Sequence, residues 1–253
     1  MKLFVKAISD IGNVRERNED MIMVCNELLR DNSKTFEFQL EELKYPLLIA
    51  IADGMGGNKG GQIASEIVLT EMKIFFEEIS SEITTHEFKS KLKNQINLIH
   101  KKILDEGKIS SERMGMGSTF TGVIFFEKVI YLLNVGDSRI YRFRNGILTQ
   151  LSRDHSLREM MQDPDAPQNI IVNSFGAGEN IFFDLEDIST RILSEDYLLL
   201  CSDGLNSELS DEEIEMYLTQ ELNIFQLVSR VKEKGGNDNI SVALISFEKI
   251  IYF

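Results

Sequence analysis

The feature that most constrains this chain is a short apolar run that stops at a carboxylate and a glycine-rich loop. Residues 46–52 are all apolar, and the next five are Asp53-Gly54-Met55-Gly56-Gly57. A continuous run of this length suits a strand buried on both faces, although a piece of buried helix gives the same pattern. The flanking glycines favour the strand, whose tip would hold Asp53 at the edge of the core. That place suits a metal or phosphate site; the alternative is a turn in which Asp53 hydrogen-bonds its own backbone.

Length and composition predict one globular domain. The chain has 253 residues, of which 43% are hydrophobic and only three are prolines, and no change in composition marks a linker. We therefore expect residues 1–253 to form a single domain. No apolar run approaches the roughly 20 residues of a membrane span, and the first residues lack the apolar core of a signal peptide. We expect a cytoplasmic monomer with no membrane partner, in which Cys25 and Cys201 are reduced thiols.

The charge balance argues against one class of partner. The chain carries 27 basic and 41 acidic side chains, a net charge of −14. Nucleic acid binding depends on neutralising phosphates with lysine and arginine, so we expect no nucleic acid partner. Excess carboxylate also concentrates divalent cations, although most of it is expected to be ordinary solvated surface.

The first half of the chain predicts strands followed by two helices. Residues 3–8 and 20–24 have the composition of strands, and a densely charged loop joins them. Residues 26–44 are polar with little period and are expected to be a long connection without chemistry. Apolar residues at helical spacing over residues 63–79 and 88–103 predict two amphipathic helices. His86 and His100 on the second helix are expected to be surface or packing residues.

The second half predicts further strands with helices between them. Strands are expected at residues 115–126, 129–135, 140–143, 197–201 and 240–245, with a hairpin turn at Asn145-Gly146. Residues 154–184 are irregular, Ser210 has the position of a helix cap, and residues 224–231 carry another apolar stripe. Strands in two groups with helix pairs between them predict a mixed α+β architecture, in which helices cover a sheet-based core.

Six carboxylates fall at strand ends: Glu19, Asp20, Asp53, Asp137, Asp203 and Asp238. Hard oxygen ligands of this kind select Mg²⁺ or Mn²⁺, and two such ions can activate a water and clamp phosphate oxygens. Phosphate-ester hydrolysis is therefore the natural chemistry, and Arg15 could present a planar fork of donors to a phosphate. Spacing alone does not show that these carboxylates converge. The alternatives are a solvated polar loop around Glu19 and Asp20 and turn aspartates at Asp53 and Asp137, with Asp137 paired to Arg139.

Seven short motifs follow one another along the chain. They begin at Arg15, Asp53, Gly117, Gly136, Asp154, Ser202 and Asp238, as Arg-x-x-Asn-Glu-Asp, Asp-Gly-Met-Gly-Gly, Gly-Ser-Thr, Gly-Asp-Ser-Arg, Asp-His-Ser, Ser-Asp-Gly-Leu and Asp-Asn-Ile-Ser. In this order they resemble the motifs of the bacterial type 2C metal-dependent serine/threonine protein phosphatases. Each motif alone is weak, but their order over residues 8–246 is specific. The resemblance implies a four-layer α-β-β-α sandwich of two antiparallel sheets, with a metal centre at one end.

The resemblance also implies a role for each site residue. Asp53 resembles the carboxylate that bridges two Mn²⁺ or Mg²⁺ ions, and Gly54 the residue that lends its carbonyl oxygen to one of them. Asp203 and Asp238 resemble the remaining direct ligands, Glu19 a ligand through water, and Asp20 a supporting residue. Asp137 resembles the ligand of a weaker third metal, and Arg15 the phosphate-binding arginine. Residues 156–178 correspond to the family's flap.

The chain departs from the family pattern in two places. Many relatives have a histidine at the position of Met55 or of Asn58, and here neither residue is histidine. Protonation of the leaving group therefore falls to metal-bound water or stays open. The flap is also shorter than in typical bacterial relatives.

The expected function is hydrolysis of phosphoserine and phosphothreonine monoesters by direct attack of a water that bridges two Mn²⁺ or Mg²⁺ ions. The expected partners are phosphorylated proteins, the substrates of a cognate serine/threonine kinase. One alternative is a weak or silent phosphoprotein-binding module on the same fold. The other is a metal-dependent phosphodiesterase or nuclease, which the acidic surface disfavours.

Overall fold

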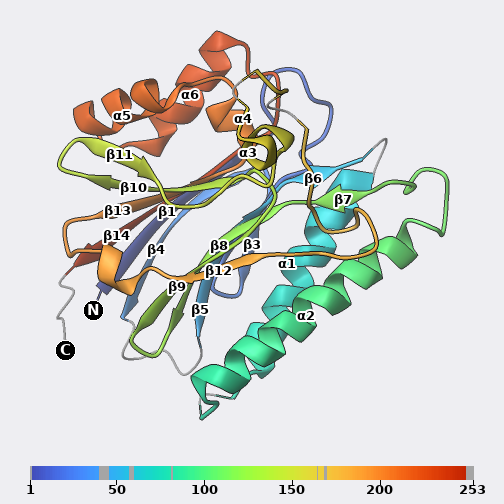
Figure 1. Ribbon diagram of the computed structural model, residues 1–253. Helices are drawn as coiled ribbons and strands as arrows, with labels where there is room; N and C mark the ends of the chain where they lie inside the picture. The colour runs from blue at the N-terminus through green and yellow to red at the C-terminus, as the bar shows by residue number, and fades with distance from the viewer. Residues whose placement is uncertain are drawn as a thin grey trace.

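Two antiparallel sheets packed face to face form the centre of the molecule, and helices cover both outer faces (Figure 1). The computed structural model describes residues 2–39, 46–56, 60–80, 82–163, 165–167 and 170–248. Every strand pair in this part of the chain is antiparallel. The α+β sandwich predicted from the sequence is therefore confirmed.

The first sheet has six strands and is covered by the C-terminal helices (Figure 1). Its spatial order is β11 (Ile147–Gln150), β10 (Arg139–Arg144), β13 (Tyr197–Cys201), β14 (Ile240–Glu248), β1 (Lys2–Asp10) and β4 (Asn32–Gln39). The covering helices are α4 (Asp203–Asn206), α5 (Asp211–Gln220) and α6 (Ile224–Lys234). Leu205, Leu218 and Leu227 from these helices pack on the outer side chains of the sheet, such as Leu199 and Val242.

The second sheet also has six strands, and two long helices cover it. Its order is β12 (Asp184–Asp187), β9 (Val129–Val135), β8 (Phe120–Phe126), β5 (Leu47–Ala52), β2 (Met21–Val24) and β3 (Glu27–Leu29). The helices are α1 (Gly60–Glu78) and α2 (Thr85–Glu106), and Thr84 begins α2 with a capping box. No helix in the described ranges combines the length and apolar character of a membrane span.

Strand β5 contributes to two cores at once. Leu47, Ile49 and Ile51 face the first sheet and pack in the core between the sheets. Leu48, Ala50 and Ala52 face the other way and pack under α1 and α2. Burial on both faces explains the uninterrupted apolar run, because successive side chains of a strand point to opposite sides. The strand predicted before Asp53 is therefore confirmed.

The prediction of a long connection over residues 26–44 is wrong. This stretch contains β3 and β4, and residues 40–45 lie outside the described part. β4 pairs only with β1 at the sheet edge, and among its residues only Phe36 is buried. An edge strand with most side chains in solvent needs few apolar residues, so its sequence shows little period.

Smaller differences concern element boundaries. The strand predicted over residues 115–126 consists of β7 (Gly117–Ser118), which pairs with β6 (Gly54–Met55), and then β8. The stretch expected to be irregular, residues 154–184, contains the short helix α3 (Leu157–Met161), and a 3₁₀ turn (Ser189–Arg191) follows it. Asn145 and Gly146 have φ of 50° and 79°, which confirms the predicted hairpin turn. Ser210 caps α5 with a capping box, as predicted.

Candidate active site

The six predicted carboxylates lie before or after strands of the sandwich. They are Glu19 and Asp20 before β2, Asp53 after β5, Asp137 after β9, Asp203 after β13 and Asp238 before β14. We call them the carboxylate cluster. Asp53 directly precedes β6 and Asp203 is the first residue of α4, and both elements are labelled at the same end of the sandwich in Figure 1.

Asp53 is held by its backbone against the strand that follows α2. Its N–H donates to Thr119 Oγ1 at 3.1 Å, and its carbonyl oxygen accepts from the Thr119 N–H at 2.8 Å and from Ser118 Oγ at 3.1 Å. Its carboxyl group hydrogen-bonds to that of Asp203. Burial, followed by the charges of Asp20 and Asp203, raises the pKa of Asp53 well above its usual range. Carboxylates distant in sequence thus meet at Asp53.

Asp20 is the most buried member of the cluster, with 1% of its surface exposed. Ser202 Oγ donates to its Oδ2 at 2.7 Å, and Ser241 also hydrogen-bonds to its side chain. Burial outweighs these bonds and raises the pKa of Asp20 to about 7. β2 begins at Met21, so Asp20 precedes the strand that it was expected to open.

Asp137 has a buried oxygen without a donor. The residue is 8% exposed, and its Oδ1 has no hydrogen-bond partner among the described residues. Burial, followed by the charges of Asp203 and Asp154, raises the pKa of Asp137 to about 7. Arg139 pairs with Asp154 and not with Asp137. A buried carboxylate oxygen without a partner costs free energy, which a cation at this point would offset.

Arg15 lies at the exposed side of the cluster. Its Nη2 donates to Asp238 Oδ2 at 2.6 Å, and half of its side chain is exposed. This hydrogen bond raises the pKa of Arg15. The nearby Glu19 is half-buried, and its pKa is raised chiefly by burial. The guanidinium therefore stands where solvent, and an incoming anion, can reach it.

Two glycines bring backbone directly against backbone at this end of the sandwich. A Cβ on Gly54 would lie 2.0 Å from the Gly61 carbonyl oxygen. A Cβ on Gly204 would lie 1.9 Å from the Asn239 carbonyl oxygen. No side chain fits at such distances, so only glycine is compatible with either contact.

The chemistry of the cluster fits divalent cations that prefer oxygen ligands. All of its donors are carboxylate oxygens, the kind that Mg²⁺ and Mn²⁺ select, and the partnerless Asp137 Oδ1 is a further point where a cation would be stabilised. Within the described ranges, no group of three or more His, Cys, Asp or Glu side chains is arranged to hold one ion. The carboxylates contact one another, two serines and Arg15 instead.

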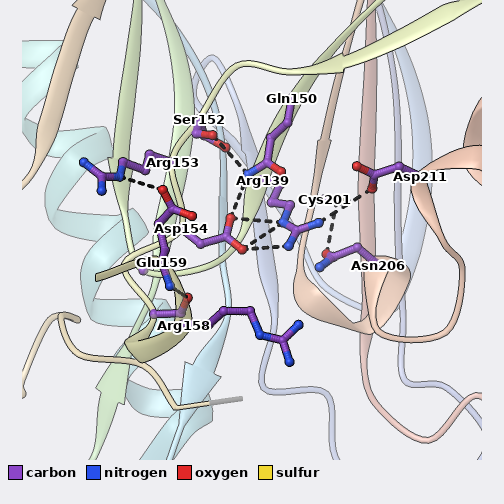
Figure 2. A network of polar contacts seen from close by, with 12 residues as sticks. Arg139, Gln150, Ser152, Arg153, Asp154, Arg158, Glu159, Cys201, Asn206 and Asp211 are labelled. Atoms are coloured by element: carbon purple, nitrogen blue, oxygen red, sulfur yellow. Dashed lines mark hydrogen bonds and ion pairs between the residues drawn. The ribbon is translucent and has the colours of Figure 1, made fainter. Parts of the chain in front are cut away.

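Arg139 lies at the centre of a polar network that the sequence did not predict (Figure 2). Nε and Nη2 of Arg139 donate to both oxygens of Asp154, with Nη2 to Oδ2 at 2.7 Å, and Nη1 donates to Tyr141 Oη at 2.9 Å. Asp211 Oδ1 lies 3.6 Å from Nη1. Burial opposes the charge on Arg139, but its bond to Asp154 prevails, and its pKa is raised. Arg139 and Asp154 each belong to one of the seven motifs, and this was the one feature of the sequence that pointed to them.

His155 is a second residue whose contacts the sequence did not reveal. Its Nδ1 accepts from the Gly136 N–H at 3.2 Å and lies 2.7 Å from Asn173 Nδ2. Because Nδ1 is an acceptor, the proton is on Nε2, which donates to Asp184 Oδ2 at 3.1 Å. His155 thereby joins the turn before Asp137 to Asn173 of the flap-like segment and to the first residue of β12.

The two departures from the family pattern fall partly outside the described residues. Met55 lies half-buried in β6, while Gly57 and Asn58 are not among the described residues. In the flap-like segment, Leu157 N–H donates to the Ile170 carbonyl oxygen at 2.8 Å, and Val172 N–H to that of His155 at 2.9 Å. The backbone at the start of α3 is thus paired with the backbone of residues 170–172.

Comparison with known proteins gives consistent results. Residues 36–244 match the family profile described as "Protein phosphatase 2C". The chain is 30% identical to the protein phosphatase PhpP of Streptococcus pneumoniae over 260 residues, covering 97% of this chain and 98% of that one. It is 28% identical to the serine/threonine phosphatase stp of Listeria innocua over 251 residues, covering 94% and 93%.

A solved structure has the same fold. The serine/threonine phosphatase of S. agalactiae superimposes with a TM-score of 0.80 at 30% identity, covering 97% of this chain and 100% of that one. An α+β sandwich with carboxylates gathered at one end, and with such relatives, defines the class: this chain is a protein-serine/threonine phosphatase. It belongs to the protein phosphatase 2C family, whose members depend on divalent metal ions.

Proposed function

We propose that residues 1–253 form one catalytic domain that hydrolyses phosphoserine and phosphothreonine monoesters with two Mn²⁺ or Mg²⁺ ions and a weaker third. The observation that carries the proposal is the set of contacts that brings the cluster together: Ser202, the neighbour of Asp203, donates from its Oγ to Asp20 Oδ2 at 2.7 Å, and Arg15 Nη2 donates to Asp238 Oδ2 at 2.6 Å. The relatives are serine/threonine phosphatases, which implies phosphoprotein substrates. We further propose that these are substrates of a cognate serine/threonine kinase and that the enzyme is a monomer.

We assign the metal-binding roles to the residues predicted from the sequence. Asp53 would bridge the two ions and the Gly54 carbonyl oxygen would bind one of them. The others would be Asp203 and Asp238 as direct ligands, Glu19 as a ligand through water, Asp20 as a supporting residue and Asp137 as the third-metal ligand. When bound, the ions would lower the pKa of a water and orient the phosphate for in-line attack.

The chain's own side chains would bind and orient the substrate. Arg15 is half exposed beside Asp238, and its planar fork can donate two hydrogen bonds to phosphoryl oxygens. Hydrogen bonds to Ser202 and Ser241 would restrain the carboxylate of Asp20 in its supporting role beside Asp53. Neither Met55 nor Asn58 can act as an imidazole acid, so these two residues donate no proton to the leaving group.

The decisive test is phosphopeptide hydrolysis with Mn²⁺, without it, and after EDTA. Asp53→Asn is expected to lower the Mn²⁺-dependent rate by more than about 100-fold, since even outer-shell partners of metal sites cost 10–100-fold. Calorimetry should show weaker Mn²⁺ binding by this variant. The matched control is Asp105→Asn, which removes an exposed carboxylate in the last turn of α2 that pairs with Lys108.

Two outcomes would contradict the proposal. Wild-type rates in Asp53→Asn would remove the assigned role of Asp53. Absence of Mn²⁺ binding by the wild-type chain would favour the silent binding module, and cleavage of a phosphodiester without any monoester hydrolysis would favour the nuclease class.

A further inference from the structure

A polar cavity of about 310 Å³ lies between the end of β11 and α3. Arg139, Arg153 and Arg158 line it together with the carboxylates of Asp154 and Glu159 (Figure 2). Three arginines against two carboxylates give the cavity a positive balance, whereas the whole chain carries 27 basic and 41 acidic side chains. We call it the arginine pocket, a locally positive site on an acidic protein.

The arginine pocket adjoins the carboxylate cluster. Arg139 follows Asp137 by two positions, so the two Cα atoms are separated by at most about 7 Å of extended chain. The charge of Asp154 acts directly on Asp137, whose pKa it raises. A peptide bound with its phosphate at the cluster would therefore pass the pocket within a few residues.

The donors of Arg139 are already used in contacts within the protein, so a ligand would have to bind to other residues of the pocket. Both oxygens of Asp154 and the hydroxyl of Tyr141 occupy its donors. Arg153 differs, because it contacts Glu159 Oε1 through Nε at 3.0 Å, and 59% of its side chain is exposed. In the described part of the chain, no acceptor meets its two terminal nitrogens, which can donate to a carboxylate as a fork.

Two buried serines supply further donors. Ser152 is 7% and Ser156 is 3% exposed, and both line the pocket. The Oγ of Ser152 accepts from the Ile140 N–H at 2.9 Å, and that of Ser156 accepts from the Glu159 N–H at 3.4 Å. Each hydroxyl proton can then be donated to a ligand. Buried hydroxyls beside an exposed guanidinium form a site for an anion.

We propose that the arginine pocket binds a glutamate or aspartate side chain of the phosphoprotein substrate, about two to four residues from the phosphorylated residue at ~3.3 Å per extended residue. The proposal rests on the proposed function, because it needs the phosphate at the carboxylate cluster. The volume is at the low end of ligand sites, which start near ~300 Å³, and suits one side chain. Glu159 contacts Arg153 in the free protein and competes with that side chain.

The experiment compares phosphopeptides that differ only in one Glu or Gln, scanned over the two to four positions on either side of the phosphoserine. The wild-type enzyme is expected to favour one Glu peptide by about fivefold in kcat/KM, the size of a partly exposed charge-assisted pair. Arg153→Ala should bring this ratio close to one. Glu159→Gln should raise the ratio, because it removes the competing carboxylate.

Opposite changes in these two variants separate ligand binding from general disturbance of the flap, which would move both in one direction. Arg230→Ala is the matched control, since Arg230 makes a comparable exposed pair with Glu233 on α6, and the ratio should not change. If the wild type hydrolyses both peptides equally at every position, the arginine pocket proposal is overturned and the phosphatase proposal stands. If it hydrolyses no phosphopeptide, both are overturned.

Discussion

Asp137 and Asp154 lie on either side of Arg139, yet only one of them is satisfied. Asp154 accepts three hydrogen bonds from Arg139 and one from Gln150. Asp137 is more deeply buried than Asp154 but has an oxygen with no partner among the described residues. A satisfied buried carboxylate stabilises the fold, whereas an unsatisfied one costs stability and needs another reason to be there. Asp154 therefore has a structural role, whereas the unsatisfied oxygen of Asp137 points to a role in function.

The strongest way to break this contrast is Asp154→Asn. Removing one partner of a largely buried ion pair leaves the Arg139 charge uncompensated, with an expected loss of about 3 kcal/mol in the free energy of unfolding. Urea denaturation measures the loss. The control, Glu186→Gln, breaks an exposed pair with Arg191 and should cost less than about 1 kcal/mol. Equal losses in both variants would mean that the Asp154 pair carries no special weight.

The pH dependence of stability tests whether the buried carboxyls of the cluster are costly when they are ionised. Asp20 and Asp137 have their pKa raised to about 7, so between pH 4 and pH 7 the folded chain binds more protons than the unfolded chain. The contribution of these two carboxyls to stability in EDTA is therefore full below pH 4 and is lost as the pH rises to 7, by up to about 1.4 kcal/mol per pH unit for each carboxyl. Denaturation midpoints from pH 4 to pH 8 measure the slope.

Divalent ions should counteract this slope. Added Mn²⁺ binds the ionised cluster and stabilises the folded state most at the higher pH. Stability that rises from pH 4 to pH 8 in EDTA would contradict the assigned shifts.

The smallest expected effect is that of Asp137→Asn in the absence of metal. At pH 8 the change removes an ionised buried carboxylate, and we expect a gain of about 1 kcal/mol, limited by the new buried amide. It should also flatten the pH slope of the EDTA-treated protein. Loss of stability comparable to that of Asp154→Asn would show that Asp137 is held by contacts as Asp154 is.

The sequence predicted those parts of the fold that rest on burial. Residues 46–52 show no alternation because β5 is buried on both faces, and the structure confirms this strand. β4 was missed because it lies at a sheet edge and most of its side chains are in solvent. The hydrophobic pattern of a sequence arises because some side chains are buried in a core. An element with few buried side chains therefore shows little pattern.

The site was predictable in its residues and less so in its contacts. The position of Asp53 at a strand tip follows from the sequence, but its meeting with Asp203 depends on strands of two different sheets. The pairing of Arg139 with Asp154 spans a hairpin and a loop, and no local spacing encodes it. The order of the seven motifs predicted that these residues converge, because it resembles a family whose fold brings all of the motifs together.

Positions in the site should differ in how well they tolerate amino-acid substitution, and Gly54 and Gly204 should tolerate it least. Their backbones touch the carbonyl oxygens of Gly61 and Asn239 so closely that any other residue displaces the chain. In a library of single variants, carboxylate positions would show graded losses that depend on the replacement, whereas these two glycines would show one uniform loss for all replacements. A screen for variants with new substrates would therefore gain diversity around the arginine pocket and none at these two positions.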